Sequence, residues 1–380
     1  MDRRRLRAII VLGVAVVPAL VLLAPRGQSE RPASAAAASD GPDSSMAGPT
    51  SFAAIGPTAI PGSSVWDEIL AAPSPAPTSK PKPAPTPKPA ANPAPAPMPK
   101  PTPKPAPCTV FPSDNVWNRR VDGLPARSDS DVLIAAIGAD DYLHPDFSST
   151  AWNGGLGYGI PINKVNLSTP KYTVSFHYAG ESDAGPYPIP AHPRIEGGSD
   201  AHLILWDTQG CRLYEIFDAH KSGGQWYGGS GAIWNLRSNK LRPNGWTSAD
   251  AAGLPILPGL VRYDEVAAGA IRHALRFTAP RTCPDHIYPA RHDAGDWSCA
   301  TYPPMGLRVR LKASVDISGF APQARVILLA LKRYGMLLAD NGSPWYVTGA
   351  PNAGWNDDQL HDFHQLHGSD FEVVDTSGFR

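Results

Sequence analysis

The sequence predicts a mainly β domain, of the β-sandwich or jelly-roll type with a buried helix near its C-terminus, behind an unfolded N-terminal region. From residue 108 onward, many short alternating runs are broken by Gly, Pro, Asn and Asp, as is typical of strands and turns. Helical patterns are few and late, at 322–334 and 357–366, which favours decorated sheets over alternating α/β units. The 43 prolines and 35 glycines exceed ordinary usage and the excess is localised, so one region is expected not to fold.

The first 24 residues have the order of charge and hydrophobicity of an export signal. Four arginines within residues 3–7 precede an apolar run, Ala8–Ala24. The run is long for a signal-peptide core and slightly short for a membrane span. A cleaved signal peptide and a retained N-terminal membrane anchor are both open. Either outcome places the rest of the chain outside the cytoplasmic membrane, secreted or tethered, with the membrane contacted only through this segment.

Residues 25–107 are expected to form a disordered tether. They are rich in Ala, Pro, Ser and Gly, with too few large apolar residues to offset the entropy lost on folding. From Ala72 onward, Pro-Lys-Pro and Pro-Ala-Pro units favour extended polyproline II. The lysines of this half suit either contact with anionic wall polymers or the solubility of a spacer.

The remaining residues, 108–380, are enough for one folded β-rich domain with a sizeable core. The formal net charge of +0 at pH 7 gives no global field to attract nucleic acid, so we expect no nucleic-acid partner, and we expect a monomer. Four cysteines in an exported chain favour two disulfides. We expect Cys283 to pair with Cys299 and Cys108 with Cys211.

A hairpin is predicted in the middle of the chain. Two runs, Ala201–Trp206 and Cys211–Phe217, flank Asp207–Gly210, which suits a type I turn with Asp first and Gly fourth. This turn would place His202 opposite Glu215, with Cβ atoms about 5 Å apart. Apolar neighbours on the same face would raise the pKa of Glu215, whereas a protonated His202 would lower it.

Two further patterns lie in the last quarter of the chain. Leu307–Lys312 alternates apolar and basic residues, so its cations form either the floor for an acidic ligand or an outer face neutralised by a neighbouring strand. Pro322–Tyr334 is predicted to be a helix that ends at Gly335 and leads into a buried strand, Met336–Ala339, and a turn at Asp340–Gly342.

The sequence lacks the familiar cofactor and metal signatures. It has no dinucleotide-binding turn, phosphate loop, nucleophile elbow or zinc helix with paired histidines. His361, His364 and His367 recur every third residue and would spiral around a helix instead of converging on one ion. We expect neither a metal nor a cofactor.

The number of aromatic residues favours a carbohydrate ligand. Indole and phenol rings offer apolar faces to sugar C–H groups and polar tips to hydroxyls. For an exported protein on a long tether, the expected partner is a polysaccharide or cell-wall polymer. The candidates for substrate binding are Trp226, Tyr227, Trp246, Arg262 and Tyr263.

The leading hypothesis is a glycoside hydrolase acting on cell-wall or environmental polysaccharide. This chemistry needs two carboxyl groups about 5–9.5 Å apart, one of them with a raised pKa. The stretch Trp246–Phe277 is dense in ionisable groups and is interpreted as one wall of a cleft that faces the hairpin. The catalytic candidates are Glu215, Asp250 and Glu265, with His202 and His273 as tuning or proton-transfer partners.

Two alternatives stay open. A polysaccharide lyase acting on a uronate polymer would use an Arg or His to neutralise the sugar carboxylate and a Tyr or His to remove a proton. Arg262, Tyr263 and His273 supply those residue types. In a non-catalytic wall-binding or structural module, the aromatic residues would bind sugar and the carboxylates would be structural.

Several motifs resemble those of a group of exported bacterial proteins. The motifs are Thr247–Pro255, Pro258–Glu265, His273–Phe277 and Tyr334–Met336 followed by Asp340–Gly342. The resemblance covers the chain from about Cys108 to its end. It implies export and one folded unit, and it carries no activity, cofactor or catalytic residue with it.

Overall fold

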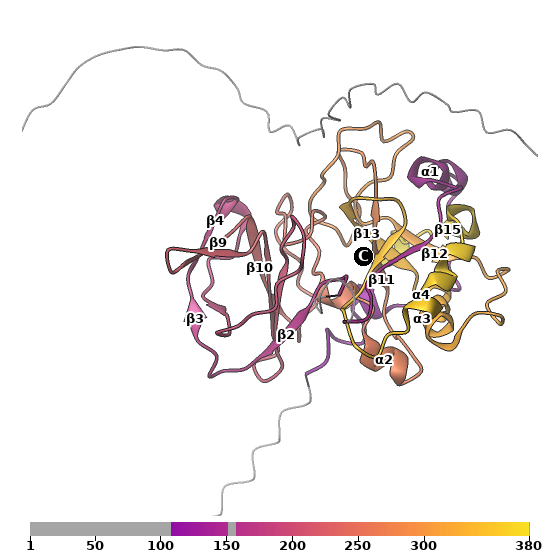
Figure 1. Cartoon of the computed structure of the whole chain (residues 1–380). Coiled ribbons are helices and arrows are strands. Elements are labelled where there is room, and N and C mark those ends of the chain that lie inside the picture. The colour runs from indigo at the N-terminus through magenta and orange to yellow at the C-terminus, as the bar shows by residue number, and fades with distance from the viewer. Residues whose placement is uncertain (1–107, 151–156, 380) are drawn as a thin grey trace, which may run out of the picture. The chain divides into compact units, whose positions relative to one another are not determined.

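The computed structural model describes residues 108–150 and 157–379 (Figure 1). The predicted signal peptide or anchor at 1–24 and the predicted tether at 25–107 lie outside the described residues. Within the described part of the chain, no helix combines the length and the apolar character needed to cross a membrane.

The described strands form two larger sheets and two small ones. Across the largest sheet the order is β1 (His144–Asp146), β14 (Tyr346–Thr348), β11 (Leu275–Ala279), β13 (Met336–Asn341), β12 (Arg308–Leu311) and β15 (Phe371–Val373). Across the second it is β10 (Ser230–Asn235), β7 (Arg212–Phe217), β6 (Leu203–Asp207) and β2 (Ile162–Val165). The small sheets pair β3 (Lys171–Tyr172) with β5 (Tyr187–Pro188), and β4 (Val174–Phe176) with β9 (Gln225–Gly228) and β8 (His220–Ser222).

Helices are short and lie mostly beside the largest sheet. The described α-helices are α1 (Ser130–Ile137), α2 (Tyr263–Ala267), α3 (Pro322–Arg333) and α4 (Asp357–His361). Short 3-10 turns occur at Val116–Asn118, Ala179–Glu181, Leu257–Gly259, Asp362–Gln365, Gly368–Asp370 and Ser377–Phe379. Figure 1 shows α3 and α4 together beside the six-stranded sheet, where α3 packs on β12 and on α4.

The mainly β prediction is confirmed, but the sheets differ from a jelly roll. Jelly rolls are antiparallel, whereas here β1 runs parallel to β14, β11 to β13 and β2 to β6. Parallel neighbours need long crossover connections. A local alternating pattern cannot reveal which distant strands pair, and the sequence prediction therefore missed this topology.

The predicted C-terminal helix is confirmed, together with the strand that follows it. Pro322 occupies the first turn of α3, and Gly335 follows the helix with φ of 64°. A left-handed residue after the last turn is what ends the helix. β13 then continues through Asn341, so Asp340 belongs to a strand and not, as predicted, to a turn.

The apolar residues form a large core and a smaller one. The large core lies on the six-stranded sheet and includes the fully buried Phe277, Leu338 and Trp345. The smaller core lies on the second sheet and includes Tyr187 and Trp226. Burying a side chain such as Leu or Phe contributes about 1.5–3 kcal/mol relative to leaving it exposed.

The predicted hairpin exists, but its register differs by two residues. In the pairing of β6 with β7, Glu215 lies opposite Ile204 instead of His202. The predicted His202–Glu215 pair is therefore wrong. The ring of His202 lies beside Phe217, with ring centroids 5.8 Å apart.

The turn itself explains the shift. The Asp207 carboxylate accepts hydrogen bonds from the backbone N–H groups of Gln209 and Gly210, as in the predicted turn. Cys211, however, has φ of 53° and stays in the loop, so the first pair of the ladder joins Asp207 to Arg212. This left-handed backbone conformation is uncommon for a residue other than glycine.

The basic row of β12 is engaged in structural contacts. Arg308 is buried and donates to backbone carbonyls of Val116 and Tyr334, and Lys312 donates to another carbonyl. Arg310 donates to Glu372 of the adjacent strand β15 at 2.8 Å. The prediction of an outer face neutralised by a neighbouring carboxylate is confirmed for Arg310 and is wrong for Arg308, which is buried against backbone carbonyls. These cations do not form a free floor for an acidic ligand.

Both predicted disulfides are confirmed. Cys108 is bonded to Cys211 over a sequence separation of 103 residues, and Cys283 to Cys299 over 16.

Replacing Cys108 and Cys211 together by Ser is expected to lower the free energy of unfolding by about 2–5 kcal/mol, because the bond closes a long loop in the unfolded chain. The same change at Cys283 and Cys299 should cost less, since that loop is shorter. Urea unfolding of the full-length variants measures both effects. Equal losses for the two pairs would contradict the loop-length explanation.

Candidate active site

Arg276 is the centre of the site. It lies on β11 in the middle of the six-stranded sheet and is 3% exposed. Its guanidinium donates two hydrogen bonds to the Asp250 carboxylate, at 3.0 and 2.7 Å, and one to the Thr348 hydroxyl at 2.5 Å. The bidentate arrangement fixes both side chains and compensates the buried charges.

Strand register places two further acids around Arg276. Asp146 on β1 lies opposite Thr348 on β14. Between β11 and β13 the register shifts by one residue before Thr278, so that Thr278 lies opposite Asp340. Such a bulge re-aims a side chain, and Arg276 Nη2 is 3.7 Å from Asp340 Oδ2. Arg276 thus stands between acids contributed by β1 and β13.

The Asp340 carboxyl favours its protonated form. Burial raises its pKa to about 7, and the negative charge of Asp250 adds to the effect while Arg276 opposes it. The side chain is still 24% exposed, so it can meet a ligand. A carboxyl that holds its proton near neutral pH is suited to proton donation.

The Asp146 carboxyl is shifted less. Burial and the charge of Glu196 raise its pKa to about 6, against the attraction of Arg276. Among the described residues, no donor forms a hydrogen bond with this carboxylate. A partly buried acid without a hydrogen bond is costly to keep, which marks Asp146 as a functional candidate.

A carboxylate–histidine pair completes the group. His202 Nδ1 donates to Glu196 through a short hydrogen bond, and Nε2 lies 3.0 Å from the carbonyl oxygen of Ala249. Burial alone would lower the pKa of His202, but the bond and charge of Glu196 outweigh it and raise the pKa to about 9. A protonated His202 donates from both nitrogens. Below, the acid cluster means Asp146, Glu196, Asp250 and Asp340 with the cations His202 and Arg276.

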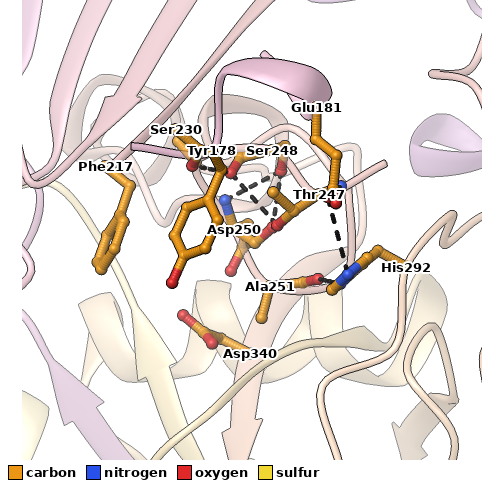
Figure 2. A pocket seen from close by; sticks show the side chains of 11 residues that line it. Tyr178, Glu181, Phe217, Ser230, Thr247, Ser248, Asp250, Ala251, His292 and Asp340 are labelled. Atoms are coloured by element: carbon orange, nitrogen blue, oxygen red, sulfur yellow. Dashed lines mark hydrogen bonds and ion pairs between the residues drawn. The ribbon is translucent and has the colours of Figure 1, made fainter. Parts of the chain in front are cut away.

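Asp340 opens into a pocket of about 290 Å³, which we call the Asp340 pocket. Figure 2 shows the Tyr178 hydroxyl pointing toward the Asp340 carboxylate, with the ring of Phe217 beside it. On another side, Glu181 lies 3.9 Å from His292 and accepts a hydrogen bond from the Thr247 backbone. The remaining lining is Ser230 and Thr247–Ala251.

Asp146 opens into a different pocket, of about 360 Å³, which we call the Asp146 pocket. His144 and Tyr346 stack there with ring centroids 4.1 Å apart. His361 also lines the pocket. The order of strands places the two pockets' acids on opposite sides of Arg276, since β14 and β11 lie between β1 and β13.

Of the predicted catalytic residues, Glu215 is fully buried. Its carboxylate accepts hydrogen bonds from the backbone N–H groups of Ile256 and Leu257, at 2.9–3.0 Å. Burial raises its pKa to about 7, in the predicted direction. These contacts anchor the chain at Leu257–Gly259 and leave the carboxylate away from solvent.

Asp250 and His202 do belong to the acid cluster, although both are bound by partners. Asp250 is 1% exposed and holds Arg276, and His202 is 3% exposed and holds Glu196. Their contacts suit them to positioning charge more than to touching a substrate.

Glu265 and His273 form a separate group. Arg262 donates to Glu265 Oε1 at 2.7 Å and lies 3.0 Å from His273 Nε2, which is 3.0 Å from Glu265 Oε2. These residues line a pocket of about 730 Å³ that shares no lining residue with the Asp340 pocket. The stretch Trp246–Phe277 therefore contributes to several separate pockets instead of forming one cleft wall.

The predicted substrate-binding aromatics are also dispersed. Trp226 is buried in the smaller core, and Tyr227 stacks on His220 with centroids 5.6 Å apart. Tyr263 packs edge-on against Trp355. Trp246 alone among these four lines a pocket described below.

The sequence prediction missed Asp146, Glu196 and Asp340. One local signal was present for Asp340, because it directly follows the buried apolar run Met336–Ala339. An acidic residue that directly follows such a run is expected near the end of a buried strand, where the sheet meets solvent. Glu196 and Asp146 offer no comparable local signal, since only strand pairing and the path of a loop bring them to Arg276.

Among residues 108–150 and 157–379, no group of three or more His, Cys, Asp or Glu side chains is arranged to hold a metal ion. Comparison with protein-family models, with curated proteins and with solved structures gave no significant match. Function is therefore inferred from the geometry of the site.

Proposed function

We propose that this protein is an exported carbohydrate-active enzyme that hydrolyses a polysaccharide at the acid cluster. One observation carries the proposal. Two partly exposed acids with raised pKa values, Asp146 and Asp340, flank a buried arginine on one face of a sheet and open into pockets. Glycoside hydrolysis uses one carboxylic acid to protonate the leaving oxygen and a second carboxylate as base or nucleophile.

The pKa values suggest the roles. Asp340, whose pKa is about 7, donates its proton to the glycosidic oxygen, and that bond then breaks. Asp146, whose pKa is about 6, is ionised at neutral pH and is the proposed second carboxylate. This role requires one glycosidic bond to reach both the Asp340 pocket and the Asp146 pocket, since the two carboxyl groups must flank the same bond. Water supplies the hydroxyl group of the new reducing end and returns a proton to Asp340.

The other members of the acid cluster hold these two acids in place. Arg276 and a protonated His202 supply two positive charges that offset Asp250 and Glu196. Asp146 has no ion pair among the described residues, and Asp340 has only the longer 3.7 Å contact with Arg276, which is already bound bidentately by Asp250. Such preorganised charge stabilises a transition state without rearrangement during the reaction.

The lining of the Asp340 pocket supports a sugar substrate. Tyr178 is 51% exposed and stands at the pocket with Phe217, so two rings are available to sugar C–H faces. Glu181, Thr247 and His292 offer polar groups for hydroxyls. The predicted export of the chain would bring it to extracellular polysaccharide.

A lyase acting on a uronate polymer is a second candidate, favoured by one observation. The Tyr178 hydroxyl points into the Asp340 pocket, and His292 lines the same pocket. A tyrosine or histidine base can remove the proton next to a uronate carboxylate. The residues involved differ from the predicted ones, since Arg262 and His273 belong to the separate group and Tyr263 packs against Trp355.

Incubating the full-length protein with a panel of neutral and uronate polysaccharides tests the proposal. New reducing ends without ultraviolet absorbance would support hydrolysis. New reducing ends together with absorbance at about 235 nm, from an unsaturated uronate product, would support the lyase reaction. Binding without any new reducing ends across the panel would overturn both and favour a non-catalytic carbohydrate-binding module.

The pH dependence of hydrolysis should be bell-shaped with its maximum at about pH 6–7. Below about pH 6 Asp146 becomes protonated and loses its charge, and above about pH 7 Asp340 loses the proton that it donates. Initial rates from pH 4 to 9 measure the profile. Activity that rises steadily to pH 9 would contradict a role for a protonated Asp340.

A further inference from the structure

A fourth pocket, of about 590 Å³, lies next to the Asp340 pocket, and we call it the Arg242 pocket. The last three residues of β10, the first residue of β7, Asp183 and the segment 238–246 contribute to it. Its lining residues are Asp183, Arg212, Ile233, Trp234, Asn235, Ser238, Lys240, Leu241, Arg242, Pro243 and Trp246.

Arg242 lines this pocket, and its side chain is buried and held by several contacts. It is 6% exposed, and its guanidinium lies 5.6 Å from the ring centre of Trp234 and 5.4 Å from that of Trp246. These distances suit cation–π contacts. The Asp183 carboxylate accepts from Arg242 at 2.6 Å and neutralises its charge.

The same guanidinium connects the two pockets. Arg242 donates to the backbone carbonyls of Glu181 and Thr247, each at 2.7 Å. Both of these residues line the Asp340 pocket. Trp246 of the Arg242 pocket directly precedes Thr247 in the chain. A ligand that extends out of the Asp340 pocket past Thr247 would therefore meet Trp246.

Two cations at the Arg242 pocket remain uncompensated. Arg212 and Lys240 are exposed, and both line the pocket. Among the described residues, neither side chain has a hydrogen bond or an ion pair. Since Asp183 is occupied by Arg242, the free charge of the pocket is positive. A cationic pocket with an indole face matches a sugar that carries a negative charge.

We infer that the Arg242 pocket is a subsite for a uronic acid unit, whose carboxylate is bound by Arg212 and Lys240 and whose ring lies against Trp246. This inference rests on the proposed function and makes its substrate an acidic polysaccharide. Arg binds carboxylates with two parallel hydrogen bonds, and Lys adds a point charge. The cleaved bond would then lie one or a few sugar units away, in the Asp340 pocket.

Calorimetric titration of the full-length Asp340→Asn variant tests the subsite without interference from hydrolysis. The ligands are a galacturonate hexasaccharide and a neutral glucose hexasaccharide. The acidic ligand is expected to bind at least about tenfold more tightly, and adding Arg212→Ala and Lys240→Ala should weaken its binding by about tenfold or more. The matched control carries Lys171→Ala and Lys221→Ala, which remove the same charge outside this pocket and should change the affinity less than about twofold.

The outcomes separate the subsite from the catalytic proposal. If neither polymer is cleaved by the wild type but the binding differences appear, the catalytic proposal fails and the subsite stands. If hydrolysis is found but the Arg212 and Lys240 variant binds the acidic ligand as its parent does, the subsite is overturned and the catalytic proposal stands. Equal binding of the acidic and neutral ligands would also overturn the subsite.

Discussion

The Asp340→Asn variant should hydrolyse a responsive polysaccharide about 10²–10⁴-fold more slowly than the wild type. Asparagine has nearly the same shape as a protonated aspartic acid and can still accept the hydrogen bond from the Asn341 backbone. It cannot give up a proton to a leaving oxygen. Initial rates of reducing-end release at pH 6.5 measure the loss.

Asp131→Asn is the matched control for this change. Asp131 is exposed on α1 and lines neither the Asp340 pocket nor the Asp146 pocket. Its replacement should leave the rate within about twofold, since surface substitutions away from special contacts have small effects. An Asp340→Asn protein that folds normally and keeps at least half of the wild-type rate would remove Asp340 from the mechanism.

The Arg276→Met variant is expected to lose about 3–5 kcal/mol of the free energy of unfolding. Met fills similar space, but it leaves the Asp250 carboxylate buried at 1% exposure without its two charged hydrogen bonds. It also leaves the Thr348 hydroxyl without its donor. Urea unfolding of the full-length chain, followed by tryptophan fluorescence, measures the difference.

A double variant distinguishes the effect of breaking the ion pair from the effect of changed packing on stability. Changing Asp250→Leu together with Arg276→Met removes both buried charges, so it should cost less than Arg276→Met alone. Arg325→Ala, at an exposed position of α3, controls for loss of an arginine and should change stability by less than about 0.5 kcal/mol. An Arg276→Met protein as stable as the wild type would show that the pair with Asp250 does not hold this region together.

The local parts of the fold could be predicted from the sequence. The helix from Pro322, its end at Gly335, the hairpin and both disulfides each depend on residues that are close in the chain or on a small number of pairing choices. The parallel pairs could not be predicted, because the strands that pair are separated by long stretches of chain. The predicted register of the hairpin was wrong because a single residue, Cys211, adopts a left-handed conformation.

The site depends on the parts that could not be predicted. Asp146 reaches Arg276 through the pairing of β1 with β14, and Asp340 reaches it through the one-residue shift between β11 and β13. Neither arrangement leaves a motif in the sequence. Glu196 lies in a loop that is placed by its contact with His202.

Apolar sequence surroundings proved a poor guide to the role of a carboxylate. Glu215 stood out because its neighbours on the strand are apolar, and Asp250 because its stretch is dense in ionisable groups; both are buried. Complete burial required them to be satisfied by backbone N–H groups or by Arg276, which leaves them little freedom to meet a substrate. The partly exposed acids beside them are better placed for chemistry.

The bond from Cys108 to Cys211 also determines how mechanical load enters the domain. A pull applied from the N-terminal side arrives at Cys108 and passes directly through the bond to the end of the β6–β7 hairpin. The chain between these two cysteines is a covalently closed loop, so the pull cannot unravel it. Asp146, Glu196 and His202 all lie inside that loop. Tension applied from the N-terminal side would therefore bypass half of the acid cluster.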